Sequence, residues 1–210
     1  MCIIVAKEKG KKLPSKRILM NCFDYNSDGA GFMYVDNGKV VIDKGYMSFN
    51  SFYKRLKELK KKYNIENKAL VMHFRIGTSG KGKENLTHPF PLSNIKNELN
   101  KQYTQSDLGI AHNGIIKRYE YHKKLSDTQA FIKDFVYPIS KLSQDFYKRK
   151  DILKILEKEC ESKLCILDPN EKIYYIGDFI KDNDIMYSNN TYKDYYSYKY
   201  LYNYYWKGSD

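Results

Sequence analysis

Long hydrophobic runs are missing from this sequence of 210 residues. No apolar stretch approaches the ~20 residues that a helix needs to span a bilayer. The first apolar run, CIIVA, is far too short for a secretory signal, and a lysine follows it instead of preceding it. These absences argue against secretion and membrane insertion, so we expect a cytoplasmic protein with no membrane partner.

Cysteine is scarce as well, and its spacing matches no metal motif. The four cysteines are Cys2, Cys22, Cys160 and Cys165. None of them forms a CxxC pair, so we expect free thiols in a reducing compartment. The patterns HxH, HExxH and GxSxG are absent too. A metal site built from His73, His88 and His112 with an aspartate, or a Ser-His-Asp triad, therefore has no spacing motif behind it. We expect neither a metal nor a cofactor.

Positive charge is in excess, with 37 Lys and Arg against 25 Asp and Glu and a formal net charge of +12. The lysines are dispersed among acidic residues and along apparent helix faces, which indicates a solvated surface. The stretch TYKDYYSYKYLYNYYW holds eight tyrosines between Tyr192 and Tyr205. Such a tail can stack bases in a nucleic-acid-binding module, or it can cover a sheet edge or form a dimer contact.

Hydrophobic periodicity predicts strands, hairpins and amphipathic helices along the chain. Strands are expected at 2–7, 69–76 and 108–113, and hairpins at 29–45 and 163–179. Helices are expected at 16–26 after Ser15, at 48–63, at 126–147 after the capping-box pattern SDTQ, and at 151–161. Hairpins and irregular loops join most strands, and regular βαβ crossovers are lacking. This order predicts an α+β fold of antiparallel sheets covered by helices.

Three stretches place polar residues where a strand or helix core would be apolar. MHFRIGTSG puts His73 and Arg75 on one face of the strongest strand, which a solvent-facing side of a sheet also explains. AHNGII ends a strand with Asn113 and Gly114, which form either a plain turn or a pair of hydrogen-bond donors for an oxyanion. In LSDTQAF, helix capping alone accounts for Asp127.

Cys2 has two interpretations. It is either a small apolar residue at the start of a buried strand, or, after removal of Met1, an N-terminal nucleophile with its own free amine. An α-amine has an unperturbed pKa of about 7.7–8.0, which suits a general base. In the second interpretation no separate histidine is needed, because the base belongs to the same residue as the thiol.

Taken together, the chain resembles the class II glutamine amidotransferase domain, a branch of the N-terminal nucleophile (Ntn) hydrolases. The resemblance depends on Cys2 after the initiator methionine and on the ordered motifs SDGAG, HFRIGTSG, ENLTHPF, HNGII and SDTQAF. It is greatest to small stand-alone members, some of which bacteriophages carry. One departure is Ile3, where the family usually has glycine. The resemblance implies a four-layer αββα sandwich of two antiparallel sheets flanked by helices.

The resemblance also implies a role for each matching residue. Cys2 is then the nucleophile, and Asn113 and Gly114 form the oxyanion hole. Arg75, Thr78 and Asp127 bind the substrate, with Arg75 on its α-carboxylate and Asp127 on its α-ammonium group. His73, Asn85, His88 and His112 are expected to line the pocket or to support it.

The implied reaction is hydrolysis of L-glutamine through a thioester, with ammonia passed to a separate synthetase or modification enzyme. Action on a different amide is the alternative enzyme activity. We expect a glutaminase domain at 1–188 and a tyrosine-rich tail at 189–210, which packs on the domain or forms an interface between copies of the chain.

Overall fold

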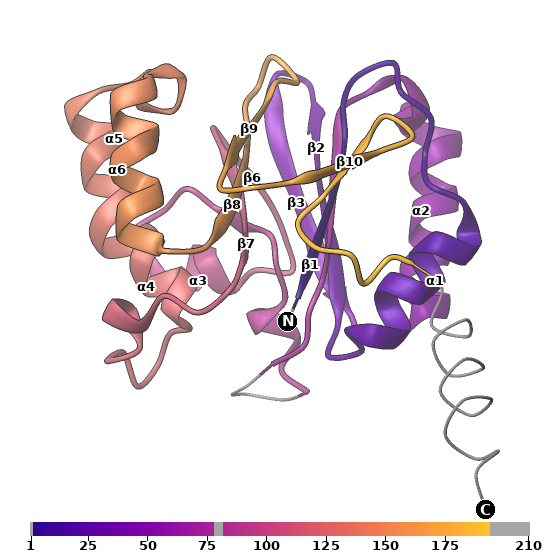
Figure 1. Ribbon diagram of the computed structural model, residues 1–210, viewed down its shortest axis with the longest axis horizontal. Coiled ribbons are helices and arrows are strands. Elements are labelled where there is room, and N and C mark those ends of the chain that lie inside the picture. Colours follow the sequence, from indigo (N-terminus) through magenta and orange to yellow (C-terminus); the bar gives the residue numbers. More distant parts are fainter. Residues whose placement is uncertain (1, 78–81, 194–210) are drawn as a thin grey trace, which may run out of the picture.

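A seven-stranded antiparallel sheet forms one inner layer of the protein in the computed structural model, which describes residues 2–77 and 82–193 (Figure 1). Its strand order is β10-β11-β1-β4-β2-β3-β6. The strands are β1 (Ile3–Lys7), β2 (Ala30–Asp36), β3 (Lys39–Tyr46), β4 (Leu70–Phe74), β6 (Tyr103–Ser106), β10 (Ile180–Asp182) and β11 (Ile185–Tyr187). The first strand of the chain therefore lies inside the sheet, between β11 and β4.

A second antiparallel sheet of four strands, in the order β5-β7-β8-β9, packs against the first. Its strands are β5 (Phe90–Pro91), β7 (Gly109–Asn113), β8 (Lys163–Leu167) and β9 (Ile173–Ile176). Ile4, Met33 and Val71 from the larger sheet meet Ala111 and Leu167 from the smaller one in a shared apolar cluster. The inner faces of the two sheets thus form the centre of the protein.

Helices cover both outer faces, which completes four layers (Figure 1). Helices α1 (Lys16–Tyr25) and α2 (Phe49–Tyr63) lie outside the seven-stranded sheet. Outside the smaller sheet lie α3 (Lys96–Asn100), α4 (Asp127–Phe131), α5 (Tyr137–Leu142) and α6 (Lys150–Cys160), with a π turn at Ile132–Val136 between α4 and α5. Short 3₁₀ turns occupy Ile65–Asn67, Glu84–Leu86, Lys117–Tyr119 and Phe146–Lys148. The architecture is the α+β sandwich that the sequence predicts.

Strand β1 shows why a continuous apolar run suits this position. Alternate side chains of a strand point to opposite faces. Ile3 and Val5 pack in the cluster beneath α1 and α2, whereas Ile4 and Ala6 pack between the sheets. Both faces of β1 are therefore buried, and a polar residue in the run would lose its hydration.

Most local predictions are confirmed. Ser15 caps α1, and Ser126 with Gln129 makes the predicted capping box. The helix predicted at 48–63 is α2, in which Ser48 is the N-cap. Asn37 and Gly38 both adopt positive φ in the β2–β3 turn, as a tight hairpin requires.

The helix predicted at 126–147 is confirmed as an unbroken helical segment from Asp127 to Leu142, but its predicted end is wrong by five residues. It comprises α4, the π turn and α5 in direct succession. Pro138 lies in the first turn of α5 and has no amide hydrogen to complete a regular helical ladder through this point.

Candidate functional site

Cys2 lies at the entrance to β1, beside the end of β4. Its Sγ is 3.4 Å from the Ile76 backbone nitrogen, which donates to it, and 3.4 Å from the Ile76 carbonyl oxygen. The side chain is partly exposed. Pairing of β1 with β4 sets this contact, because Ile3 lies opposite Phe74 in the sheet.

Arg75 follows β4 and is held by the SDGAG segment. The Arg75 nitrogen donates to the Gly29 carbonyl at 2.8 Å, and its carbonyl accepts from the Asp28 nitrogen at 2.8 Å. The Gly77 nitrogen donates to the Asp28 carboxylate at 2.7 Å. A Cβ at Gly77 would lie 2.5 Å from a guanidinium nitrogen of Arg75. A side chain at position 77 would therefore displace the guanidinium that packs on the loop. Asp28 is a support for this loop that sequence reasoning did not assign.

Asn113 and Gly114 end β7, in the smaller sheet. Gly114 has φ +151°, and a Cβ there would lie 2.5 Å from the Ser162 Cβ. Asn113 is buried, and its Nδ2 donates to the Ser188 Oγ at 2.8 Å. The two residues thus sit in a fixed turn, and the Asn113 amide is oriented by the segment that follows β11.

Asp127 is the first residue of α4. Its Oδ2 accepts from the Ile116 nitrogen at 2.7 Å, and its Oδ1 accepts from the Thr128 nitrogen at 2.8 Å. The capping box around Ser126 and Gln129 orients this helical turn. The carboxylate consequently joins the loop after HNG to the start of the helix.

Three buried histidines lie close to these residues, and one of them, His112, faces α4 through its contact with Thr128. The His73 Nε2 donates to the His112 carbonyl at 2.9 Å, and the His112 nitrogen donates to the His88 Nδ1 at 3.2 Å. His73 and His88 stack with ring centroids 4.3 Å apart. The interpretation of His73 as a surface residue is wrong, because its side chain is fully buried between the sheets.

Burial keeps these imidazoles neutral. It lowers the pKa of His73 to about 3 and that of His112 to about 4, although Asp127 opposes the shift at His112. Burial also takes the pKa of His88 well below its ordinary value. Ser162 donates its hydroxyl to the Cys160 carbonyl, so the His112 Nε2, 2.6 Å from that Oγ, is the donor of the pair. Its Nδ1 is left to accept from the Thr128 hydroxyl at 2.8 Å.

The ring nitrogens that make these bonds are occupied by protein groups. Among residues 2–77 and 82–193, no three His, Cys, Asp or Glu side chains are grouped so that they could hold a metal ion.

A cavity of about 470 Å³ opens beside Cys2, and its lining includes residues next to the ends of β1, β4 and β7 and residues of α4. The predicted site residues that line it are Cys2, Arg75, Asn85, His88, His112, Gly114 and Asp127. Asn113 and His73 are not among its lining residues, although His112 and Gly114 on either side of Asn113 are. The predicted substrate-binding residue Thr78 falls outside the described residues, as does the tail from 194 onward, with its predicted oligomer and nucleic-acid contacts.

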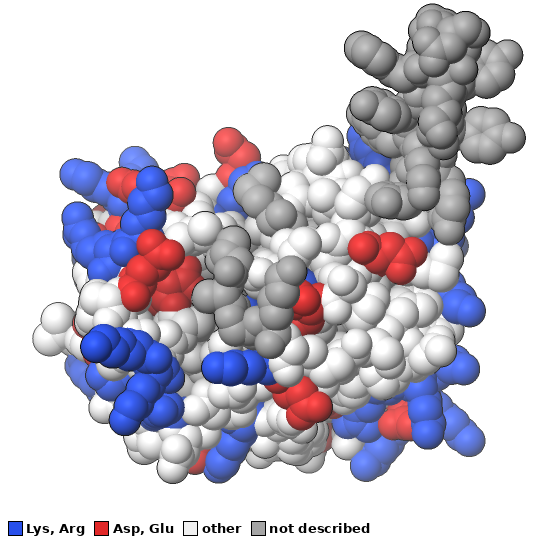
Figure 2. All heavy atoms as spheres, turned by 90° about the horizontal axis from the view of Figure 1, so that it is seen from below, with Lys and Arg blue, Asp and Glu red and all other residues white. Residues whose placement is uncertain are grey.

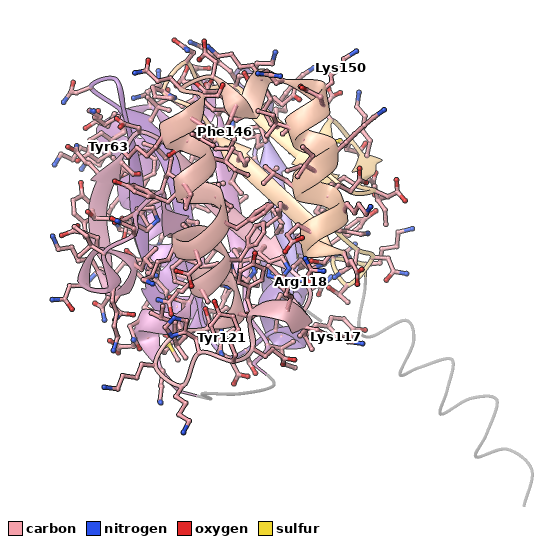
Figure 3. All side chains as sticks on the ribbon, turned by 90° about the vertical axis from the view of Figure 1, so that its left-hand side faces the viewer. Tyr63, Lys117, Arg118, Tyr121, Phe146 and Lys150 are labelled. Carbon is pink, nitrogen blue, oxygen red and sulfur yellow. The ribbon has the colours of Figure 1, made fainter. Side chains whose placement is uncertain are left out.

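The cavity also has a basic side that sequence reasoning missed. Lys83, His122, Lys123 and Lys124 line it. The last three lie on the segment between β7 and α4, and Figure 3 shows Lys117, Arg118 and Tyr121 of that segment at the lower end of the helical layer. The run YHKK, one residue before the SDTQAF motif, was the available signal. On the face seen in Figure 2, basic side chains lie on both flanks with acidic ones among them, so this face carries no single basic patch.

The thiol of Cys2 is not activated by its surroundings alone. Burial raises the pKa of Cys2, while the hydrogen bond from Ile76 and the charge of Arg75 act in the opposite direction. Since burial is the largest effect, the thiol is protonated near neutral pH. A nucleophilic role at this position consequently requires a base within reach of Sγ.

The four layers, with a cysteine at the entrance to a central strand and a polar cavity beside it, are consistent with an Ntn-type sandwich. The family model described as "Glutamine amidotransferases class-II" matches residues 18–132, which is more than half of the chain. The chain belongs to this family. All five motifs from SDGAG to SDTQAF lie inside the match, whereas Cys2 precedes it. No curated protein matches the chain significantly.

Membership of the family implies glutamine amidotransferase activity, with glutamine as the substrate and an acceptor partner for the amide nitrogen. A search of the described part of the chain finds no helix that is long and apolar enough to span a membrane.

Proposed function

We propose that this protein is a glutaminase of the class II type, in which Cys2 is the nucleophile after Met1 has been removed. The observation that supports the proposal best is the composition of one cavity. Cys2, Arg75, Gly114 and Asp127 come from four separate segments of the chain, and all line the same space. A thiol, a cation, a turn with backbone amide donors and a carboxylate are the groups that an α-amino acid amide requires.

The reaction begins with transfer of the thiol proton to the α-amine of Cys2, directly or through one water. The sulfur attacks the side-chain carbonyl carbon of glutamine, and Asn113 Nδ2 with the Gly114 nitrogen stabilises the oxyanion. The C–N bond then breaks, the protonated amine gives its proton to the leaving nitrogen, and ammonia departs. Water hydrolyses the thioester, which releases glutamate and restores the thiol.

In this proposal the substrate is recognised by two charged side chains of opposite sign, Arg75 and Asp127. Arg75 is proposed to bind the α-carboxylate through two parallel hydrogen bonds. Asp127 is proposed to bind the α-ammonium group with the outer lone pairs of the carboxylate, since its two short hydrogen bonds come from the backbone nitrogens of Ile116 and Thr128. Amides without an α-amino acid group then bind poorly.

The ammonia is proposed to pass to a separate protein. From residue 133 to residue 193 the strands β8 to β11 join the two sheets already described, and α5 and α6 belong to the outer helical layer. These residues complete the sandwich instead of forming an acceptor domain of their own. The acceptor that we propose is a synthetase or modification enzyme in trans.

The test is glutamate release from glutamine by protein whose intact mass shows Met1 removed. We expect turnover that Cys2→Ala abolishes and that Cys165→Ala, a buried thiol outside the cavity, leaves in place. A chloroketone analogue of glutamine should alkylate Cys2, and glutamine should block this alkylation. The labelling is expected even if turnover requires the acceptor protein. Turnover that survives Cys2→Ala, or labelling at another cysteine, would overturn the proposal.

A further inference from the structure

The segment immediately after β11 reaches the candidate site from the far end of the chain. Ser188 continues the pairing of β11 with β1, because its nitrogen donates to the Ile4 carbonyl at 3.0 Å. Its hydroxyl, and not its carbonyl, accepts from the Ile4 nitrogen at 2.8 Å. The Ser188 carbonyl instead accepts from the Lys163 Nζ at 2.6 Å. The serine side chain thus replaces a backbone acceptor in the sheet.

The same hydroxyl holds the Asn113 side chain. Ser188 Oγ accepts from Asn113 Nδ2 at 2.8 Å, and Ser188 is fully buried. Asn113 Oδ1 is also buried and makes no hydrogen bond to any described residue. Ser188 is consequently the side chain that fixes the amide, and it ties the amide to the start of the strand that carries Cys2.

Asn189 acts on Cys2 itself. Its Nδ2 donates to the Cys2 carbonyl at 2.7 Å. Its Oδ1 accepts from the Thr191 nitrogen at 3.0 Å and from the Thr191 hydroxyl at 2.7 Å, so the amide orientation is set from both ends. The side chain therefore fixes the peptide plane that follows the proposed nucleophile.

The segment that carries these side chains is itself anchored. The Tyr192 ring stacks on Tyr187 with centroids 3.7 Å apart, and its hydroxyl donates to Asp182 at 2.9 Å. The Tyr192 carbonyl accepts from Asn21 on α1 at 3.2 Å. Contacts on both sides hold residues 188–192 in place. A segment that positions other groups must itself be held in this way.

We propose that Ser188 and Asn189 are positioning residues, with Asn189 orienting the nucleophile and Ser188 orienting the oxyanion donor. The inference rests on the proposed glutaminase function. A chain-terminal residue has no preceding peptide to hold it, so a hydrogen bond to its carbonyl limits rotation of both its thiol and its amine. Misplacement by about 1 Å costs on the order of 10²-fold in rate. The boundary predicted between 188 and 189 would separate two residues that act together, so both belong to the glutaminase domain.

Asn189 is tested with a pair of substitutions. Asn189→Asp keeps an acceptor for Thr191 and loses the donor to Cys2, and Asn189→Ala loses the donor without adding charge. We expect kcat to fall on the order of 10²-fold in both, with KM changed by less than about threefold. Asn190→Ala is the matched control, because it truncates an exposed asparagine of the same segment. It should retain wild-type kcat.

Ser188 is tested through its coupling to Asn113. Ser188→Ala leaves two buried donors without an acceptor, so the variant's thermal midpoint must be recorded with its kinetics. If Ser188 acts through the amide, Ser188→Ala lowers kcat in the wild-type background and has little further effect in Asn113→Ala. Independent losses in the two backgrounds would show that Ser188 serves stability alone and would overturn its role.

Alkylation of Cys2 by iodoacetamide separates failure of this inference from failure of the proposed function. The assay reads out thiol reactivity and needs no glutamine. We expect about tenfold slower modification of the N-terminal peptide in Asn189→Asp, because the carboxylate disfavours the thiolate. If the wild-type protein turns over glutamine, and both Asn189 variants have the same kcat and the same alkylation rate as the wild type, the inference is overturned. If the wild-type protein shows neither glutamine turnover nor labelling by the chloroketone analogue, while alkylation is slowed in Asn189→Asp, only the proposed function is overturned.

Discussion

His73 in the larger sheet donates its Nε2 hydrogen to the carbonyl of His112 in the smaller sheet, at 2.9 Å. The bond joins β4 to β7. Two proposed site residues lie close by in the sequence, Arg75 after His73 and Asn113 after His112. The bond connects the two halves of the sandwich through a neutral imidazole. The position of the proposed oxyanion donor relative to the proposed carboxylate-binding arginine therefore depends on buried histidine.

The first prediction concerns acid stability. The folded pKa values of His73 and His112, about 3 and about 4, and the lowered pKa of His88 all lie below the ordinary value. Below about pH 6.5 the unfolded chain binds protons that the folded chain does not, so the free energy of unfolding falls as the pH falls. The loss approaches about 4 kcal/mol per pH unit for three protons and stops growing once the folded pKa values are passed.

Urea unfolding at a series of pH values between about 7 and about 4.5 measures that slope. In His73→Gln the slope should decrease by the equivalent of one proton. His122→Gln, which changes a partly exposed histidine, is the control. A flat profile in the wild-type protein would show that the buried rings are protonated in the folded state.

The second prediction concerns the turn after β7. Gly114→Ala places a Cβ 2.5 Å from the Ser162 Cβ at φ +151°. We expect a loss of about 2–3 kcal/mol in unfolding free energy, since strain and overpacking add. Gly10→Ala is the matched control, because Gly10 also has positive φ but has nothing within 4 Å of the added Cβ. It should lose only about 1 kcal/mol. Equal losses in denaturant melts would contradict the close approach to Ser162.

The third prediction concerns the proposed oxyanion hole. Asn113→Ala should lower kcat for glutamine by about 10²–10³-fold, because one donor to the developing charge is lost. Glutamine KM should change much less, since that charge is absent in the ground state. Steady-state kinetics on the processed protein supply both values. Near-normal turnover by a folded variant would remove Asn113 from the mechanism.

The fourth prediction concerns the proposed binding of the α-amino acid group. Arg75→Lys and Asp127→Asn should each raise glutamine KM by roughly 10–100-fold, the equivalent of one charged hydrogen bond. Asp151→Asn is the control for Asp127→Asn, because Asp151 also lies in the first turn of a helix but outside the cavity. An unchanged KM in Asp127→Asn would leave the carboxylate with only its structural bonds to Ile116 and Thr128.

Much of the local structure was predictable from the sequence, because its causes are local. The caps at Ser15, Ser48 and Ser126 and the Asn37-Gly38 turn depend on hydrogen bonds and dihedral angles within a few residues. The long apolar strands were equally clear. Strands β5, β6, β10 and β11 were not predicted, since two to four residues are too few to show a period, and their pairing partners supply the stabilising bonds.

The sequence by itself determined the α+β class, the ordered motifs of the family and most of the residue types in the proposed site. The tertiary structure alone decided that His73 is buried, that Asn113 bonds to Ser188, and that Asp28 supports the Gly77 loop. It also decided that Asn189 meets Cys2 across 187 positions of the chain. Sequence patterns reflect interactions between residues that are close along the backbone. Contacts such as these arise only when sheet pairing and burial bring distant segments within hydrogen-bonding distance.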